Sequence, residues 1–161
     1  DVDFPEVIAE RKRYYTESAD YQMISGDARE YSWLENIPEK ECAIVVMEGV
    51  SMYLTSKELS DLTTELSNHF EKFVLLMDCY TNMAAKMTKY KNPINEVGVT
   101  EVYGMDDPLV LQKDGFIFVK EHSMTPEKYI NELKGIEKFI FKNMFAGSFA
   151  KRLYRLFEYQ K

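Results

Sequence analysis

Length, composition and charge limit what this chain can be. Its 161 residues can bury the core of one domain, and 45% hydrophobic with 14% aromatic residues predict that it folds. The net charge of −7, from 27 acidic and 20 basic residues, lacks the basic character of nucleic-acid-binding surfaces. No apolar run approaches the roughly 20 residues that span a bilayer. We therefore expect a single domain over residues 1–161, with no nucleic-acid and no membrane partner.

Two cysteines, Cys42 and Cys79, each lie at the edge of an apolar run that we interpret as a strand. If the strands are parallel, Cys42 begins one and Cys79 ends the other, roughly 15 to 20 Å apart at about 3.3 Å per residue. That separation excludes a disulfide, and two thiols without further ligands at zinc-site spacing predict no metal site. A reducing, cytoplasmic location is the simplest expectation.

The amino-terminal residues predict a strand that ends just before Asp3 and a helix that begins at Pro5, because proline is favoured at the first helical position. An acidic residue just past a strand accepts hydrogen bonds from ribose hydroxyls in Rossmann-like sheets. Aspartate is also a common helix N-cap, and taken alone Asp3 fits that role better.

A short strand over residues 21–24 is expected to run into Gly26 and Asp27. Gly26 permits an unusual turn, and Asp27 can accept a hydrogen bond from an exocyclic amine such as that of adenine. By itself this segment specifies no ligand.

Five consecutive apolar residues, 43–47, predict a strand buried on both faces. It ends at Glu48 and Gly49, so a carboxylate reaches the edge of the sheet where open α/β sheets bind ligands. Capping-box spacing between Thr55 and Glu58 predicts that a helix begins at about Ser56. Strand, acidic turn and helix together form a βα unit with a site at its top.

A second buried strand is predicted over residues 73–77. The amphipathic helix between the two apolar runs predicts a right-handed crossover, with the strands adjacent and parallel. The helix after the second strand should close near Asn92 and Pro93, and a short helix should begin at Asp107 and Pro108.

The last third of the chain predicts a strand over residues 116–123, whose polar end carries His122 to the rim of the sheet. A helix capped at Thr125 and ended by Gly135 should follow. A further helix around residues 136–146 and a final strand, antiparallel to the others, complete the expected order.

Four segments, in this order, resemble the motif series of the leucine carboxyl methyltransferase family, which also includes polyketide O-methyltransferases of the tetracenomycin type. They are VDFPEVI at 2–8, GDAREYSWL at 26–34, EGVSMYL at 48–54 and YGMDDP at 103–108. Any one of them could occur by chance, whereas four in register along the whole chain are specific.

This resemblance implies an α/β fold: a Rossmann-like class I methyltransferase sheet, mostly parallel, with an antiparallel last strand. It implies S-adenosylmethionine as the cofactor, with Asp3 on the ribose, Asp27 and Ala28 on the adenine, and Glu48 near the amino-acid end and the sulfonium. A carboxylate suits the last position because the donor carries positive charge.

The chain departs from the family pattern at its start. The family's first strand, its glycine-rich turn and the helices before them have no counterpart, and the chain contains no G-x-G. We therefore expect the carboxyl-terminal part of a methyltransferase domain, with the strand order 3-2-1-4-5-7-6 and a vacancy in place of strand 1. A missing amino-terminal segment or another chain would complete the sheet.

An acceptor pocket is the least specified part of the prediction. Its candidate residues, each also a plain core candidate, are Met52, Tyr53, Tyr80, Tyr103 and His122. The sequence names no catalytic base, and the acceptor is a hydroxyl or carboxylate of a small molecule or a peptide end. An NAD-type oxidoreductase and a non-catalytic, partner-binding remnant of the same fold remain as alternatives.

Overall fold

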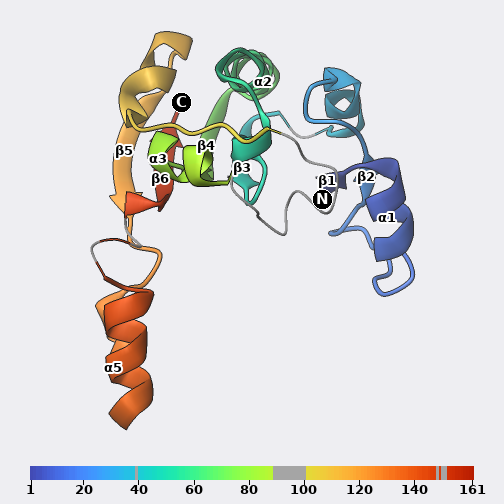
Figure 1. Ribbon diagram of the computed structural model, residues 1–161. Helices are drawn as coiled ribbons and strands as arrows, with labels where there is room; N and C mark the ends of the chain where they lie inside the picture. Colours follow the sequence, from blue (N-terminus) through green and yellow to red (C-terminus); the bar gives the residue numbers. More distant parts are fainter. Residues whose placement is uncertain (39, 89–100, 148, 150–151) are drawn as a thin grey trace.

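The structure, a computed structural model, describes residues 1–38, 40–88, 101–147, 149 and 152–161 (Figure 1). Its main sheet has the strand order β3-β4-β6-β5, formed by β3 (Cys42–Met47), β4 (Lys72–Tyr80), β6 (Tyr154–Gln160) and β5 (Ile117–His122). Strands β3 and β4 are parallel, and β6 is antiparallel to both of its neighbours. The predicted neighbouring strands and the antiparallel last strand are confirmed.

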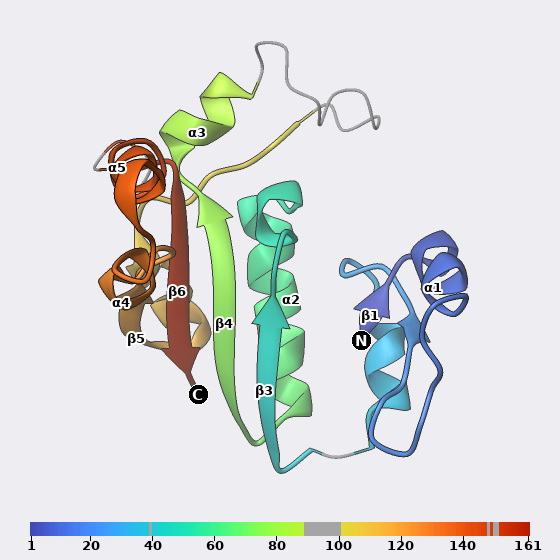
Figure 2. The ribbon, with the colours of Figure 1, turned by 90° about the horizontal axis from the view of Figure 1, so that it is seen from below.

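A second, two-stranded parallel sheet holds β1 (Val2–Asp3) and β2 (Ile24–Ser25). Strand β2 begins where the predicted strand over residues 21–24 was expected to end. Figure 2 shows this small sheet beside β3, but within the described residues no ladder joins the two sheets. The break falls where the resemblance leaves strand 1 vacant.

One face of the main sheet packs against the helix α2 (Ser56–His69) and the 3₁₀ helix η4 (Pro108–Asp114). Thr55 and Glu58 form the predicted capping box, so α2 begins at Ser56 as expected. Four side chains of β4 and β6 on this face are completely buried: Leu75, Met77, Phe157 and Tyr159. Burial of each such side chain contributes on the order of 1.5–3 kcal/mol, which makes this face the core of the protein.

The opposite face of the sheet is open, and here the prediction for residues 43–47 was wrong. Ile44 is 73% exposed and Val46 63% exposed, although both lie in the apolar run that was expected to be buried on both faces. Alternate residues of a strand point to opposite faces, and α2 covers only the face that carries Met47. An apolar run shows that a strand is hydrophobic. It does not show whether another element packs on each face of that strand.

The amino-terminal and central helices follow the sequence pattern closely. Helix α1 (Pro5–Arg11) begins at its proline, and η1 (Tyr31–Asn36) places the Trp-Leu pair of the second motif in the core. Helix α3 (Asn82–Met87) begins after β4, while its predicted end near residues 92–93 lies outside the described residues. The short 3₁₀ helix η2 (Ser51–Tyr53) follows the Glu48-Gly49 turn.

Two helices between β5 and β6 differ from the prediction. Helix α4 (Glu127–Ile130) is shorter than expected, and tighter turns continue to Leu133. Gly135 does not end this helix; it begins α5 (Gly135–Met144), with a positive φ of 54°. Glycine tolerates that conformation at either end of a helix, so its use as a stop signal alone was misleading.

Helix α5 projects from the body of the protein, on the opposite side of the sheet from α2 (Figure 1). None of its residues is buried. In the described part of the chain, no helix is long and apolar enough to cross a membrane.

Candidate functional site

The candidate site lies at one edge of the main sheet, where β3, β4 and β5 end. Strand β5 runs in the same direction as β4 because both are antiparallel to β6. Asp78 of β4 pairs with Leu156, which pairs in turn with His122 of β5, so Asp78 and His122 point to the same face. Glu48 follows Met47, whose side chain is in the core, and therefore starts on that same open face.

Asp78 holds the acidic turn in place. Only 3% of the residue is exposed, and its two carboxylate oxygens accept the backbone N–H of Gly49 at 2.9 and 3.0 Å. The Tyr154 hydroxyl donates a hydrogen bond to the same carboxylate, and the Ser51 hydroxyl donates to the Asp78 carbonyl oxygen. Gly49 has φ of 69°, a conformation that favours glycine. This bonding fixes the turn that carries Glu48.

Neither Asp78 nor Tyr154 was predicted from the sequence as a site residue. The signal for Asp78 was present, because a carboxylate within an otherwise apolar buried strand needs hydrogen-bond donors. Burial, followed by the hydrogen bond to Asp78, raises the pKa of the Tyr154 phenol, so its hydroxyl remains a donor across the neutral range. Its ring packs edge-on against Tyr80, with centroids 5.4 Å apart.

Glu48 has an unused carboxylate. It is exposed, and within the described residues it forms no hydrogen bond and no ion pair. A free carboxylate on a rigid turn can accept hydrogen bonds from an ammonium group or face a cationic centre.

Asp3 lies at the end of β1 and also retains acceptor capacity. Its carboxylate accepts the Phe4 N–H at 2.9 Å and one Arg11 N–H at 3.3 Å, while Arg11 binds Asp1 more closely at 2.5 Å. The N-cap of α1 is Phe4, so Asp3 is not the cap. A carboxylate has about four acceptor positions, and the two that remain suit a pair of neighbouring hydroxyls.

Asp27 is already paired within its own segment. Arg29 donates to both carboxylate oxygens through its side chain, at 2.6 to 3.1 Å, and its backbone N–H donates at 2.9 Å. This guanidinium lowers the pKa of Asp27. Trp33 donates its indole N–H to the Asp27 carbonyl, and Ala28 packs against the core. An incoming amine would therefore compete with Arg29 for the Asp27 carboxylate.

Two of the five pocket candidates, Tyr103 and His122, line different pockets, while the Tyr103 N–H donates to the Met52 carbonyl at 2.8 Å. Met52 is buried, Tyr53 is partly exposed, and Tyr80 packs on Tyr154. Tyr103 lines a pocket of about 260 Å³ near the amino end of α2. His122 lines a separate pocket of about 440 Å³ at the end of β5.

The fourth motif closes over the end of β4. Met105 donates its N–H to the Tyr80 carbonyl at 2.7 Å, and Asp106 accepts the N–H of Asn82 at 2.9 Å. A Cβ on Gly104 would lie 2.5 Å from backbone atoms of Thr81 and Asn82. This close approach explains why the motif has glycine there, and it fixes the segment against the rim.

Two curated methyltransferases are similar in sequence to this chain. No family model matches the chain. It is 26% identical over 161 residues to the tetracenomycin polyketide synthesis O-methyltransferase TcmP of Streptomyces glaucescens, covering 99% of this chain and 60% of that protein. It is 27% identical over 124 residues to the S-adenosyl-L-methionine-dependent methyltransferase dpfgK of Gibberella zeae, covering 70% of this chain and 42% of that protein.

A solved structure has the same fold. A SAM-dependent methyltransferase from Archaeoglobus fulgidus superposes with a TM-score of 0.57 and 17% identity, covering 99% of this chain and 74% of that one. The chain thus spans between about 40% and 60% of the curated relatives it matches. The predicted resemblance is confirmed: this chain has the Rossmann-like α/β fold of class I methyltransferases and is similar along nearly its whole length to a tetracenomycin-type O-methyltransferase.

Proposed function

We propose that this chain is the carboxyl-terminal part of a methyltransferase domain that uses S-adenosylmethionine to methylate an oxygen atom of a small molecule or a peptide end. The observation that carries the proposal is the Glu48 turn. A free carboxylate stands at the ligand-binding edge of the sheet, on a turn that the buried Asp78 holds. The similarity to TcmP includes this segment, because it extends over 161 residues.

Three further residues take roles that their surroundings support. Asp3 has free acceptors for the ribose hydroxyls of the cofactor. Glu48 lies near the amino-acid end and the sulfonium of the cofactor, and bound S-adenosylmethionine supplies an electrophilic methyl group there. Asp27 and Ala28 contact the adenine. The Asp27 carboxylate then accepts hydrogen bonds from both Arg29 and the exocyclic amine of the adenine. Because Arg29 already binds the Asp27 carboxylate at 2.6 Å, the hydrogen bond from the adenine to Asp27 is the weakest of these cofactor contacts.

The open sheet face supports the proposal that the domain has further parts. Ile44 and Val46 expose apolar side chains on the open face of β3, and the outer edge of β3 has no partner strand in the described residues. Natural proteins rarely leave a hydrophobic sheet edge uncovered. We infer that an amino-terminal segment, or failing that another chain, pairs with β3 and covers this face.

Calorimetry with S-adenosylmethionine, its demethylated product S-adenosylhomocysteine and NAD tests the proposal. We expect weak or undetectable cofactor binding by residues 1–161 and micromolar binding by a form extended upstream of Asp1, because each missing polar contact is worth about 1 kcal/mol. Micromolar binding by residues 1–161 would show that no further segment is needed for the cofactor. If the extended form binds NAD in place of S-adenosylmethionine, or binds neither, the result would contradict the proposed function.

A further inference from the structure

We propose that a pocket between α2, η4 and the fourth motif holds an apolar group of the methyl acceptor, up to about one substituted ring in size. This pocket, which we call the α2 pocket, then sets the size of the acceptors that fit. The inference rests on the proposed methyl transfer to oxygen, and it applies equally to a hydroxyl and to a carboxylate acceptor.

The α2 pocket has an apolar floor and a volume of about 260 Å³. The floor consists of four apolar lining residues that are at most 6% exposed: Leu54, Leu59, Cys79 and Leu111. An apolar cavity of about 150 Å³ is large enough to bind benzene. The α2 pocket therefore has room for one ring with a short substituent, and such walls are typical of small-molecule sites.

The acidic and thiol groups that line the pocket are neutral or bonded to the protein. Asp106 accepts the backbone N–H of Asn82 at 2.9 Å and its side-chain amide at 2.7 Å. Asp107 accepts the Leu109 N–H at 2.9 Å. Burial raises the pKa of the Cys79 thiol to about 12, so the thiol stays protonated near neutral pH. A ligand therefore gains mainly from the burial of apolar surface in this pocket.

The α2 pocket lies beside the turn that carries Glu48. Ser51 lines the pocket and follows Glu48 by three residues, which span at most about 11 Å. The Ser51 hydroxyl donates to the Asp78 carbonyl, and the Asp78 carboxylate accepts the Gly49 N–H. Asp78 thus fixes both the turn and the pocket wall. An acceptor whose apolar group occupies the pocket has its other end within reach of the edge at which we place the methyl group.

The wall formed by the fourth motif is held in place by hydrogen bonds to other elements. The Tyr103 N–H donates to the Met52 carbonyl at 2.8 Å. The side chain of Arg155, on β6, donates to the Asp106 carbonyl at 2.6 Å. A site whose walls are already bonded loses less conformational entropy when a ligand binds.

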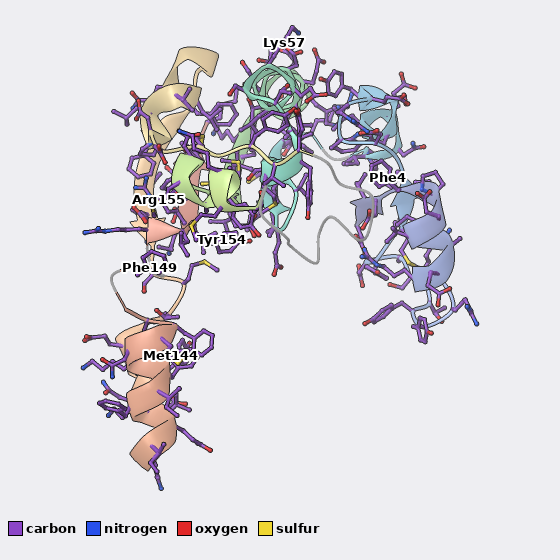
Figure 3. All side chains as sticks on the ribbon, in the orientation of Figure 1. Phe4, Lys57, Met144, Phe149, Tyr154 and Arg155 are labelled. Carbon is purple, nitrogen blue, oxygen red and sulfur yellow. The ribbon has the colours of Figure 1, made fainter. Side chains whose placement is uncertain are left out.

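Two consecutive residues at the start of α2 differ in their position relative to the pocket. Ser56 is exposed, lines the pocket and is not part of the Thr55–Glu58 capping box. The side chain of Lys57 is 83% exposed and pairs with Asp61 on the outer side of α2 (Figure 3). A bulky side chain at position 56 therefore enters the pocket, whereas one at position 57 stays in solvent.

Fluorobenzene is a neutral, one-ring probe whose binding is followed by fluorine NMR in the absence of the cofactor. We expect residues 1–161 to bind it with a dissociation constant of roughly 1 mM, because so small a ligand has a low ceiling of affinity. Ser56→Phe should weaken binding by about fivefold or more, since the new ring occupies the pocket. Lys57→Phe is the matched control and should change the affinity by less than about twofold.

Further variants locate the bound probe. Val110 of η4 lines the pocket, while its neighbour Leu109 is 49% exposed. Val110→Phe should weaken fluorobenzene binding by about fivefold or more, and Leu109→Phe by less than about twofold. If Val110→Phe is unfolded by circular dichroism, Ser56→Phe decides, because its position is exposed. Ile44→Ser on the open sheet face and Phe139→Ser on α5 test the other exposed apolar surfaces, and a loss above about twofold in either would overturn the proposal.

A form extended upstream of Asp1 tests whether the pocket is separate from the cofactor site. We expect saturating S-adenosylmethionine to change its fluorobenzene affinity by less than about threefold, because acceptor and cofactor must bind together. Displacement of the probe by the cofactor would overturn the proposal. The same holds for no binding of fluorobenzene to residues 1–161, or unchanged binding by folded Ser56→Phe. Failure of the extended form to bind S-adenosylmethionine would contradict the proposed function, whereas the probe measurements on residues 1–161 do not involve the cofactor.

Discussion

The two faces of the main sheet differ in what they do for the protein. The face toward α2 holds completely buried side chains such as Leu75 and Phe157, and the capped helix α2 covers it. The open face exposes Ile44 and Val46, and at its edge it carries Glu48, Asp78 and His122. Stability therefore comes mainly from one face, while the proposed chemistry and any further covering segment belong to the other. This division gives each face its own expected response to mutation.

The largest expected effect compares one buried and one exposed residue in the same sheet. Leu75→Ala should lower the free energy of unfolding by about 2–5 kcal/mol, because it leaves a cavity in the packed face. Ile44→Ala should lower it by less than about 0.5 kcal/mol, as is usual for surface changes. Urea unfolding of both variants gives the comparison. A loss at Ile44 as large as that at Leu75 would mean that the open face is covered in solution.

An intermediate effect is expected at the edge of the sheet. Asp78→Ala leaves the Gly49 N–H and the Tyr154 hydroxyl without their acceptor, and should cost about 2–6 kcal/mol at about 1–3 kcal/mol for each unpaired group. Asp106→Ala is the matched control at the same edge, because its carboxylate accepts the exposed backbone N–H and side-chain amide of Asn82, and it should cost about 1 kcal/mol. Thermal unfolding of the two variants measures the difference. Equal losses would show that Asp78 does not fix the turn.

The smallest expected effect depends on pH. The Arg29 side chain lowers the pKa of Asp27 below its ordinary value of 3.8 in the folded protein. The ion pair therefore stabilises the protein fully above that value, and the contribution is lost as the pH falls through the lower, folded pKa. Asp27→Asn should make the unfolding free energy less dependent on pH below about 4, as measured by urea titration at several pH values. The same slope in both proteins would show that the unfolded state pairs these residues equally well.

Much of the architecture was predictable from local signals. Apolar runs, the Thr55 capping box and the proline at the start of α1 predicted elements and their starts, and the crossover rule predicted that β3 and β4 are parallel neighbours. The motif order placed β1 and β2 apart from β3. These features depend on residues close together in sequence, or on topological rules that hold across proteins.

The features that the sequence could not predict depend on the register of strands far apart in the chain, or on whether another element covers a face of the sheet. His122 and Glu158 are 36 residues apart, and they meet only because β5 and β6 pair antiparallel in one register. Asp78 and Tyr154 meet across β4 and β6 for the same reason. The exposure of Ile44 reflects the absence of a covering element in the described residues, which hydrophobicity cannot report.

The most direct test of the central claim is the effect of Glu48→Gln on two ligands in whichever form of the protein binds them. This substitution keeps the shape of the side chain and removes its charge. If Glu48 faces the sulfonium, the cationic S-adenosylmethionine should lose about tenfold in affinity, or about 1.4 kcal/mol, and neutral-sulfur S-adenosylhomocysteine clearly less. Asp3→Ala, through the shared ribose, should weaken both ligands alike. Equal losses for the two ligands in Glu48→Gln would place Glu48 on a group that they share, and no loss for either would remove the Glu48 turn from the site.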